Sequence, residues 1–328
     1  MGPKKIFVTG GAGYVGGILI PRLLQDGHSV TVLDLMIYGE EVLPNNVNLK
    51  AIKGDIRDQS VLRDLIPGHD IVIHLACISN DPSFEMNPDL GKSINLDAFR
   101  PLVEISRDNF VERFIYASSS SVYGVKEEPH VHEEMSLEPL TDYSIFKADC
   151  EKILLEYQSK DFTTITIRPA TVCGYSPRQR LDVVVNILTN LAFHKREITI
   201  FGGSQLRPNI HIKDMAEAYI SLINAPKEKV AGEIFNAGYE NHSVRQIGEI
   251  VKEAIGQDVV LKTVPTDDNR SYHVSSEKMK KVLGFTATNT IRDACLELKH
   301  AFETGLLPNS LEDELYFNIK RMQSSDMK

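Results

Sequence analysis

Apolar and polar positions divide the first half of the chain into short apolar runs that alternate with segments of helical periodicity. The runs are apolar at successive positions, which is typical of strands buried on both faces of a parallel sheet. This alternation predicts an α/β fold, a doubly wound parallel sheet with helices on both faces. Strands are expected at residues 5–9, 29–33, 49–52, 70–74, 113–117 and 163–168, and helices at 14–25, 87–107 and 142–159.

After about residue 172 the alternation becomes less regular. We expect a first domain at residues 1–172, to which the chain returns around 231–255. Residues 173–328 are expected to form mainly a smaller α/β domain that covers the carboxyl edge of the main sheet. The polar tail after Leu306 is expected on the surface. Within this half, helices are expected at 181–194 and 244–255, a strand at 233–237, and a strand followed by a helix within 210–224.

The composition is that of a folded globular protein. Of 328 residues, 42% are apolar and 25% are charged, which excludes a mainly disordered chain. The net charge of −9 argues against nucleic acid or an anionic membrane as a partner. No apolar run reaches the roughly 18 residues that span a bilayer. The first residues lack the apolar core of a signal peptide, so we expect a cytoplasmic protein.

The cysteines are widely spaced and form no CxxC pair. Neither a zinc site nor a disulfide framework is therefore predicted, and no metal is expected. In a reducing compartment they are expected to be small buried residues. The four are Cys77, Cys150, Cys173 and Cys295.

A glycine-rich turn, Gly-Gly-Ala-Gly-Tyr-Val-Gly at residues 10–16, follows the first expected strand and opens a helix. In such a turn Gly10 permits the sharp bend, Gly13 lets a diphosphate approach the backbone, and Gly16 lets the helix pack close to the strand. The helix N-terminus attracts the anion. The first domain is therefore expected to be a Rossmann domain that binds a dinucleotide.

Acidic residues follow the next two strands. Asp34 ends the second strand, 18 residues after Gly16. A carboxylate there accepts hydrogen bonds from a ribose diol and repels a 2′-phosphate, which favours NAD over NADP. Asp55 and Ile56 follow the third strand and are expected at the adenine edge.

Tyr143 and Lys147 are four residues apart in an expected helix, so both side chains project from one face. An ammonium group beside a phenol lowers the pKa of the phenol, and Tyr143 can then act as a general base near neutral pH. A serine-rich segment, residues 118–121, follows the fifth strand. Because no GxSxG pattern surrounds these serines, a hydrolase nucleophile is not predicted.

These motifs occur in an order that resembles the extended short-chain dehydrogenase/reductase family, which includes the NAD-dependent nucleotide-sugar epimerases and dehydratases. The resemblance extends from about residue 4 to residue 300. Besides the glycine turn and Asp34, the motifs that carry it are Asp55-Ile56, His74-Leu-Ala76, Asn95, Ser118–Gly124, Tyr143–Lys147, Arg168-Pro169, Phe201-Gly-Gly203, Arg207–Asp214, Asn236–Gly238, Arg270–Lys278 and Leu283–Phe285.

The resemblance implies a role for each matching residue. Tyr143 is expected to be the catalytic base, Lys147 to hold the nicotinamide ribose, and Ser119 to hydrogen-bond the reacting sugar oxygen. The residues expected to bind NAD are Gly10, Gly13, Tyr14, Val15, Gly16, Asp34, Leu35, Asp55, Ile56, Leu75, Ala76, Cys77, Asn95, Ala117, Tyr143, Lys147 and Pro169. Those expected to bind a nucleotide-diphosphate sugar are Ser83, Ser119, Ser120, Thr171, Arg178, Arg180, Arg207 and Arg270.

Arginines are the most informative of the residues expected to bind substrate, because their planar fork suits phosphate oxygens. Arg207 and Arg270 match the arginines that grip the sugar-nucleotide diphosphate in this family. Arg178 and Arg180 either hold a phosphate or an acidic sugar or pair with acidic neighbours. Their segment also resembles the branch that oxidises nucleotide-activated heptoses at C4. Thr171 stands where the 4-epimerases commonly have asparagine.

The reaction is predicted from what the serine-rich segment lacks. The dehydratases of the family carry an Asp-Glu pair directly after the catalytic serine or threonine, where this chain has Ser120 and Ser121. Elimination would lack its acid and base there, which leaves hydride transfer at a sugar carbinol. We expect an NAD-dependent nucleotide-sugar 4-epimerase or 4-oxidoreductase. The alternatives are a 4-dehydrogenase, a 4-keto-sugar reductase and, from another class, a dinucleotide-binding protein without turnover.

The helical segments at 87–107 and 141–158 match those that form a four-helix dimer interface in this family. A homodimer is therefore expected, and a solvent-facing helix in a monomer is the alternative.

Overall fold

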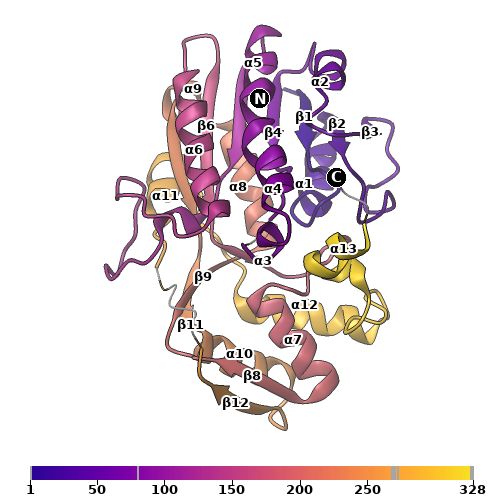
Figure 1. Cartoon of the computed structure of the whole chain (residues 1–328), viewed down its shortest axis with the longest axis vertical. Helices are drawn as coiled ribbons and strands as arrows, with labels where there is room; N and C mark the ends of the chain where they lie inside the picture. Colours follow the sequence, from indigo (N-terminus) through magenta and orange to yellow (C-terminus); the bar gives the residue numbers. More distant parts are fainter. Residues whose placement is uncertain (1, 80, 267–270, 272, 326–328) are drawn as a thin grey trace.

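The computed structural model describes residues 2–79, 81–266, 271 and 273–325 (Figure 1). Its centre is a seven-stranded sheet with the strand order β10-β6-β5-β4-β1-β2-β3, in which every neighbouring pair is parallel. The predicted doubly wound parallel sheet is confirmed. The strands are β1 (Lys5–Thr9), β2 (Ser29–Asp34), β3 (Leu49–Lys53), β4 (Ile71–His74), β5 (Arg113–Ala117), β6 (Thr163–Pro169) and β10 (Glu233–Ala237).

The strands in the middle of the sheet are apolar at successive positions because helices cover both faces. Every residue of β4 is buried. The expectation of two-sided burial fails at β3, an edge strand whose residues are exposed or half-buried.

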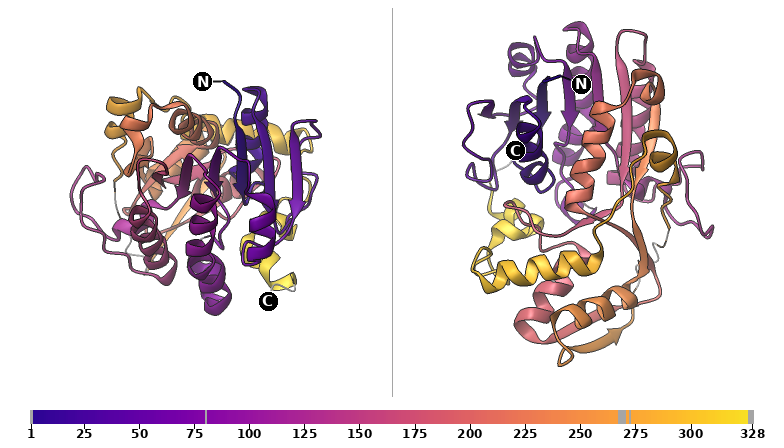
Figure 2. Two further views of the ribbon diagram at one scale, coloured as in Figure 1. Left: turned by 90° about the horizontal axis from the view of Figure 1, so that it is seen from above. Right: turned by 180° about the vertical axis from the view of Figure 1, so that it is seen from behind.

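Two layers of helices sandwich the sheet (Figures 1 and 2). On one face, α1 (Gly16–Gln25), α8 (Ile212–Asn224) and α11 (Glu277–Leu283) share an apolar core with β1 residues such as Val8. On the other face, α2 (Gln59–Leu65), α5 (Phe99–Asp108) and α6 (Asp142–Glu156) pack around Phe7 of β1. Shorter turns complete this part: α3 (Asp81–Glu85), α4 (Pro88–Lys92), the π-helix η1 (Ser93–Asp97), the 3₁₀-helix η2 (Ser120–Tyr123) and α9 (Lys227–Val230).

The single helix expected at 87–107 is divided into α4, η1 and α5. Asn87 caps α4 by accepting the N–H of Leu90 at 3.1 Å. Within η1, Asn95 turns inward, and its amide exchanges two hydrogen bonds of 2.9 Å with the backbone of Ile78. The local π geometry therefore accompanies a buried contact with the loop after β4, as such interruptions commonly do.

The elements outside the central sheet and its covering helices form a second part, which has small sheets and an apolar core of its own. Strands β7 (Thr171–Cys173), β9 (Leu206–His211) and β11 (Glu240–Ser243) form one sheet, and β8 (Glu197–Phe201) pairs with β12 (Val260–Val264). Apolar side chains join β8 to the helices that cover it. These and the remaining helices are α7 (Val184–Lys195), α10 (Val244–Ile255), α12 (Ile291–Glu303), η3 (Glu314–Tyr316) and α13 (Asn318–Ser324).

The tail after Leu306 runs along the surface for much of its length, as expected, but three of its residues are buried in the protein. Leu307, Ser310 and Asn318 are only 4%, 2% and 3% exposed. Leu307 packs in a small apolar core with Leu298 of α12, and the Ser310 hydroxyl donates to Asn190 Oδ1 at 2.7 Å. The polar composition of the tail hides these anchors, because buried hydroxyl and amide groups are satisfied by hydrogen bonds.

Candidate active site

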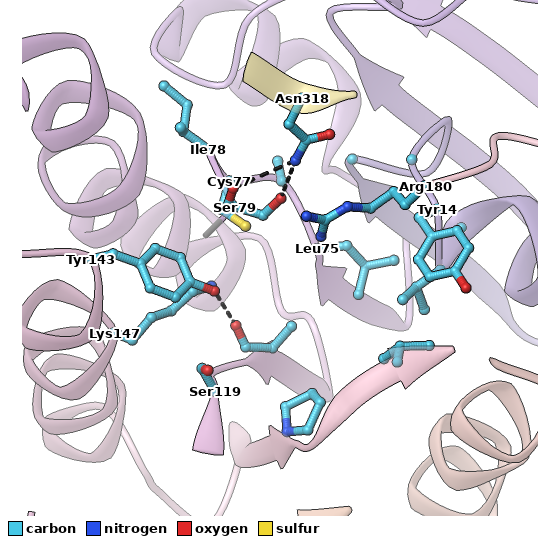
Figure 3. Close-up of a pocket in the computed structure, with 18 of the residues that line it drawn as sticks. Tyr14, Leu75, Cys77, Ile78, Ser79, Ser119, Tyr143, Lys147, Arg180 and Asn318 are labelled. Atoms are coloured by element: carbon cyan, nitrogen blue, oxygen red, sulfur yellow. Dashed lines mark hydrogen bonds between the residues drawn. The ribbon is translucent and has the colours of Figure 1, made fainter. Parts of the chain in front are cut away.

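A cavity of about 550 Å³ lies beyond the carboxyl ends of the central strands and is also lined by residues of the second part (Figure 3). In doubly wound sheets, ligands bind in this crevice, where the strand order reverses. Most of the predicted site residues line it: Gly10, Gly13, Tyr14, Val15, Gly16, Asp34, Leu35, Asp55, Ile56, Leu75, Ala76, Cys77, Ala117, Ser119, Ser120, Tyr143, Lys147, Pro169, Thr171, Arg178, Arg180 and Arg207.

Three predicted residues stand apart from this set. Ser83 lies in α3, is fully buried and does not line the cavity. Asn95 does not line it either, because both ends of its amide hold the backbone of Ile78. Asn95 therefore shapes the cavity wall through Ile78, which does line it. Arg270 lies outside the described residues.

The glycine turn is shaped to leave its backbone open to the cavity. Gly10 has a φ of +73°, and a Cβ there would lie 2.5 Å from the backbone nitrogen of Ala76. A Cβ on Gly16 would lie 2.1 Å from the carbonyl oxygen of Gly11. Side chains are excluded at both positions, so the turn packs closely on itself and on the loop after β4, and Gly10, Gly13 and Gly16 line the cavity. This fits the diphosphate of a dinucleotide, which backbone N–H groups and a helix N-terminus bind.

The Asp34 carboxylate fastens the glycine turn to the end of β2. Its Oδ2 accepts the N–H of Ala12 at 3.0 Å, and its Oδ1 accepts the N–H of Met36 at 2.8 Å. Burial raises the pKa of Asp34, opposed by these two N–H groups and by the charge of Arg178. An ionised carboxylate has about four acceptor positions, so Asp34 can still accept bonds from a ribose diol.

Tyr143 and Lys147 both line the cavity from the first two turns of α6 (Figure 3). The helix start is fixed by a capping box between Thr141 and Ser144. The Lys147 ammonium donates to the carbonyl of Ala117 at 2.7 Å and lies 5.8 Å from the centre of the Tyr143 ring. The helix cap and the end of β5 together hold a cation beside the phenol.

Ser119 lies at the end of β5 and caps η2. Its Oγ accepts the N–H of Ser121 at 3.1 Å and is 2.9 Å from the Ser121 hydroxyl. Figure 3 shows Ser119 on the same side of the cavity as Tyr143 and Lys147. The structure therefore brings the three predicted catalytic residues together.

A buried ion pair lies under this serine segment. The Arg168 guanidinium is 2% exposed and binds both carboxylate oxygens of Glu151, at 2.9 and 2.6 Å. Glu151 also accepts the Ser118 hydroxyl, and Arg168 donates to the Tyr123 hydroxyl at 2.7 Å. Although burial opposes the charge, the Glu151 carboxylate raises the pKa of Arg168. Through this ion pair, the Arg-Pro motif at 168–169 supports the serine-rich segment of the site.

The second part contributes a cluster of charged residues to the cavity. Arg178 and Arg180 line it together with Asp182, whose Oδ1 accepts from Arg180 Nε at 2.8 Å. Arg207 lines it from β9. Arg178 also stacks on the ring of Tyr38, at 3.5 Å from guanidinium carbon to ring centre.

Several lining residues are absent from the sequence-based prediction. They come from segments without a motif, and Asn318 belongs to the tail that was expected on the surface. No local pattern marks them, because their position depends on long-range packing. Among them are Tyr38, Ile78, Ser79, Asp182, Asn318 and Met322.

Within residues 2–79, 81–266, 271 and 273–325, no cluster of three or more His, Cys, Asp or Glu side chains is arranged to hold a metal ion. No helix in that part of the chain is long and apolar enough to cross a membrane.

The cavity joins a turn that accepts a diphosphate to a phenol held beside an ammonium group, and this defines the class: an enzyme that uses a dinucleotide for hydride chemistry. Sequence comparison gives the family. The model of the NAD dependent epimerase/dehydratase family matches residues 6–238, and the chain belongs to this family. The predicted family, enzyme class and cofactor NAD are confirmed.

Individual relatives cover nearly the whole chain. A UDP-glucose epimerase of Bacillus subtilis, itself described as uncharacterised, is 30% identical over 88% of this chain and 95% of its own length. The human dTDP-D-glucose 4,6-dehydratase is 29% identical over 84% of this chain and 83% of its own. The UDP-glucose 4-epimerase of Thermotoga maritima, solved with UDP-glucose, superposes with a TM-score of 0.83 and 26% identity, covering 92% of this chain and 99% of that one. Epimerases and dehydratases are thus both among the relatives.

Proposed function

We propose that this chain is an NAD-dependent nucleotide-sugar 4-epimerase or 4-oxidoreductase that transfers a hydride at a sugar carbinol. The observation that carries the proposal is the convergence of Ser119, Tyr143 and Lys147 on the cavity that also receives the glycine turn. A nucleotide sugar as substrate is supported by the relatives that act on UDP-glucose and dTDP-glucose.

In the proposed mechanism, Tyr143 as phenolate takes the proton of the sugar hydroxyl. Lys147 stabilises the phenolate electrostatically, and Ser119 hydrogen-bonds the reacting sugar oxygen. NAD, when bound, would supply the hydride acceptor at the same sugar carbon, so that loss of one hydride and of the proton taken by Tyr143 would turn the carbinol into a ketone. In the epimerase, Tyr143 would return its proton to the sugar oxygen while the hydride returned to the opposite face of the sugar, and no net oxidant would be consumed.

The serine-rich segment separates this proposal from dehydration. Elimination of water needs an acid and a base beside the sugar C5 and C6. The residues directly after Ser119 are Ser120 and Ser121, and both line the cavity. A hydroxyl supplies neither group near neutral pH, so the proposed chemistry stops at hydride and proton transfer.

The test is to incubate the purified protein with NAD and, separately, UDP-glucose, UDP-galactose, UDP-N-acetylglucosamine and dTDP-glucose. Inversion at C4 is followed by NMR, and net NADH formation at 340 nm. Inversion without NADH indicates the epimerase, whereas NADH that accumulates indicates the 4-dehydrogenase. Oxidation of NADH by a 4-keto sugar indicates the reductase. NAD binding with no hydrogen exchange on any sugar would favour the protein without turnover.

A variant of the proposed base tests the mechanism. Tyr143→Phe should lower the rate at least 100-fold, because it removes the proton acceptor. Tyr239→Phe is the matched control, since Tyr239 is an exposed tyrosine outside the cavity lining. Full activity of the Tyr143→Phe protein would reject the mechanism.

We also propose a homodimer through the outer faces of α5 and α6. The two helices lie side by side, joined by an ion pair of 3.0 Å between Arg100 and Glu156, and Ile145 of α6 is 37% exposed. Ile145→Arg should convert a dimer to a monomer in light scattering after gel filtration. A wild-type monomer, or a variant that stays dimeric, would contradict this interface.

A further inference from the structure

The segment that follows β7 is folded against the glycine turn. The Ser176 hydroxyl donates to the carbonyl of Tyr14 at 2.8 Å, and the Tyr14 hydroxyl donates to the carbonyl of Gly174 at 2.6 Å. A Cβ on Gly17 would lie only 2.7 Å from the Ser176 hydroxyl oxygen. These contacts hold residues 174–182 beside the start of α1, which is where a dinucleotide diphosphate binds.

Two guanidinium groups of this segment have buried N–H groups without a partner. Arg178 is 4% exposed, and its Nε has no hydrogen-bond partner within the described residues. The Nη2 of Arg180 is likewise buried and unpaired there. Leaving such a donor unsatisfied is costly, and the cost falls when a phosphate oxygen accepts the bond. Both residues also line the cavity.

The position of these arginines favours the cofactor over the sugar. Arg178 stacks on Tyr38, which follows Asp34 at the end of β2, and its charge acts on the Asp34 carboxylate. Figure 3 shows Arg180 beside Tyr14 and Leu75, on the opposite side of the cavity from Tyr143 and Lys147. The sugar carbon must lie near Tyr143 for proton transfer, whereas the glycine turn lies near Arg180.

Asn318, a residue of the C-terminal tail, holds Arg178 beside Tyr38 through hydrogen bonds. Asn318, the first residue of α13, accepts from Arg178 Nη2 at 2.5 Å and from the Tyr38 hydroxyl at 3.0 Å. Its amide nitrogen donates to the Ser79 hydroxyl at 2.9 Å, and its backbone N–H donates to Asp182 Oδ2 at 3.0 Å. One side chain therefore ties the loops after β2 and β4 to the second part, across the cofactor half of the cavity.

We propose that Arg178 and Arg180 bind the diphosphate of NAD from the side opposite the glycine turn, and that Asn318 is a latch that slows release of the cofactor. From the sequence alone, Arg178 and Arg180 were expected to bind a substrate phosphate or an acidic sugar, or to form ion pairs with acidic neighbours. The proposed contact places both arginines at the cofactor instead. It deepens the proposed function but rests only on the dinucleotide, because both arginines and the glycine turn line the same cavity and the contact needs no sugar.

The diphosphate contact is tested by calorimetric titration of NAD, ADP-ribose and adenosine, without any sugar. Arg180→Met should weaken NAD and ADP-ribose alike by roughly 10- to 100-fold, the effect of losing a charged hydrogen bond. Adenosine, which has no phosphate, should bind the variant as it binds the wild type. Arg245→Met is the matched control, because Arg245 is an exposed arginine of α10. Arg180→Lys keeps the charge but loses the fork, and serves if the methionine variant does not fold.

The outcomes separate this proposal from the enzymatic one. NAD affinity within twofold of wild type in both Arg180 variants would overturn the diphosphate contact, and a loss of nucleotide-sugar affinity instead would return the arginine to the substrate. Weakened NAD binding in a protein that converts no sugar would leave the contact standing while the proposed function fails.

The latch is tested by the rate at which bound NADH leaves, followed by its fluorescence after mixing with excess NAD. Asn318→Ala should raise this rate about tenfold, because it frees both the tail and Arg178. Gln323→Ala is the control, since Gln323 is an exposed residue of the same helix. An unchanged release rate in the Asn318→Ala protein would refute the latch.

Discussion

The charge of Lys147 should set the pH at which the enzyme works, and the size of the effect follows from one distance. The ammonium lies 5.8 Å from the centre of the Tyr143 ring. With an effective dielectric constant of about 20, a unit charge at that distance is worth about 3 kcal/mol to the phenolate. Since 1.36 kcal/mol corresponds to one pH unit, removal of the charge should move the rising limb of the pH–rate profile up by about two pH units.

The perturbation is Lys147→Met, which keeps the aliphatic length and removes the ammonium. The assay is the rate of C4 inversion or NADH formation between pH 6 and pH 10, at saturating NAD and with the sugar found by the panel above. At pH 7 the variant should be about 100-fold slower, and it should recover much of this loss at high pH. Lys152→Met is the control, because it removes an ammonium from the same helix at a side chain that is 72% exposed.

The measurement that tests the charge of Lys147 is the shift of the pH–rate profile to higher pH, and not the loss of rate alone. Lys147 also donates to the carbonyl of Ala117 at 2.7 Å, and its loss could lower activity by disturbing this contact. A uniform loss at every pH, with the rising limb unmoved, would show that Lys147 acts through position and not through charge.

Three further predictions concern the cofactor and the buried polar groups. Asp34→Asn should reduce the preference for NAD over NADP, measured as the ratio of their dissociation constants, because the repulsion of a 2′-phosphate is lost; an unchanged ratio would count against the role of this carboxylate. Glu151→Gln should lower the free energy of unfolding by roughly 3–5 kcal/mol in urea, because it leaves the buried Arg168 without its counter-charge, and the double variant Glu151→Leu/Arg168→Met should recover part of it. Burial lowers the pKa of His74 to about 3, so the unfolded chain binds a proton below about pH 6.5 that the folded chain does not, and stability falls as the pH drops through that window. His74→Gln should reduce the slope of unfolding free energy against pH between 3 and 6.5 by up to about 1.4 kcal/mol per pH unit, and an equal slope in both proteins would contradict this.

Local patterns predicted the part of the fold that local physics determines. A strand that is buried on both faces must be apolar at successive positions, and the central strands were found close to their predicted bounds for this reason. The glycine turn could also be predicted from the sequence, because positions such as Gly10 admit no residue with a side chain. The strand β3 was predicted at 49–52, but its exposure was not, and neither was the division of the 87–107 helix. The division accompanies the contact of Asn95 with Ile78, which is distant in sequence.

The same distinction applies to the site. Tyr143 and Lys147 were predicted because their spacing places both on one helix face, whereas the role of Ser119 was implied by the resemblance to the family. Asn318 was not predicted, because it reaches the cavity only through the fold of the whole second part. The sequence could identify Arg178 and Arg180 as candidate phosphate ligands, but their assignment to a sugar nucleotide or to the cofactor depends on Tyr38 and Asp34, which lie far from them along the chain.

The choice between epimerase and dehydrogenase depends on cofactor exchange as well as on chemistry. Both reactions begin with the same hydride transfer, and they diverge when the reduced cofactor either returns its hydride or leaves. On the proposal that Asn318 must leave Ser79, Arg178 and Tyr38 before the dinucleotide can escape, the latch favours return of the hydride, because the keto sugar needs only to rotate within the cavity. On this argument the Asn318→Ala protein should form more net NADH per inversion than the wild type does, so that weakening the latch shifts the product from epimer toward ketone.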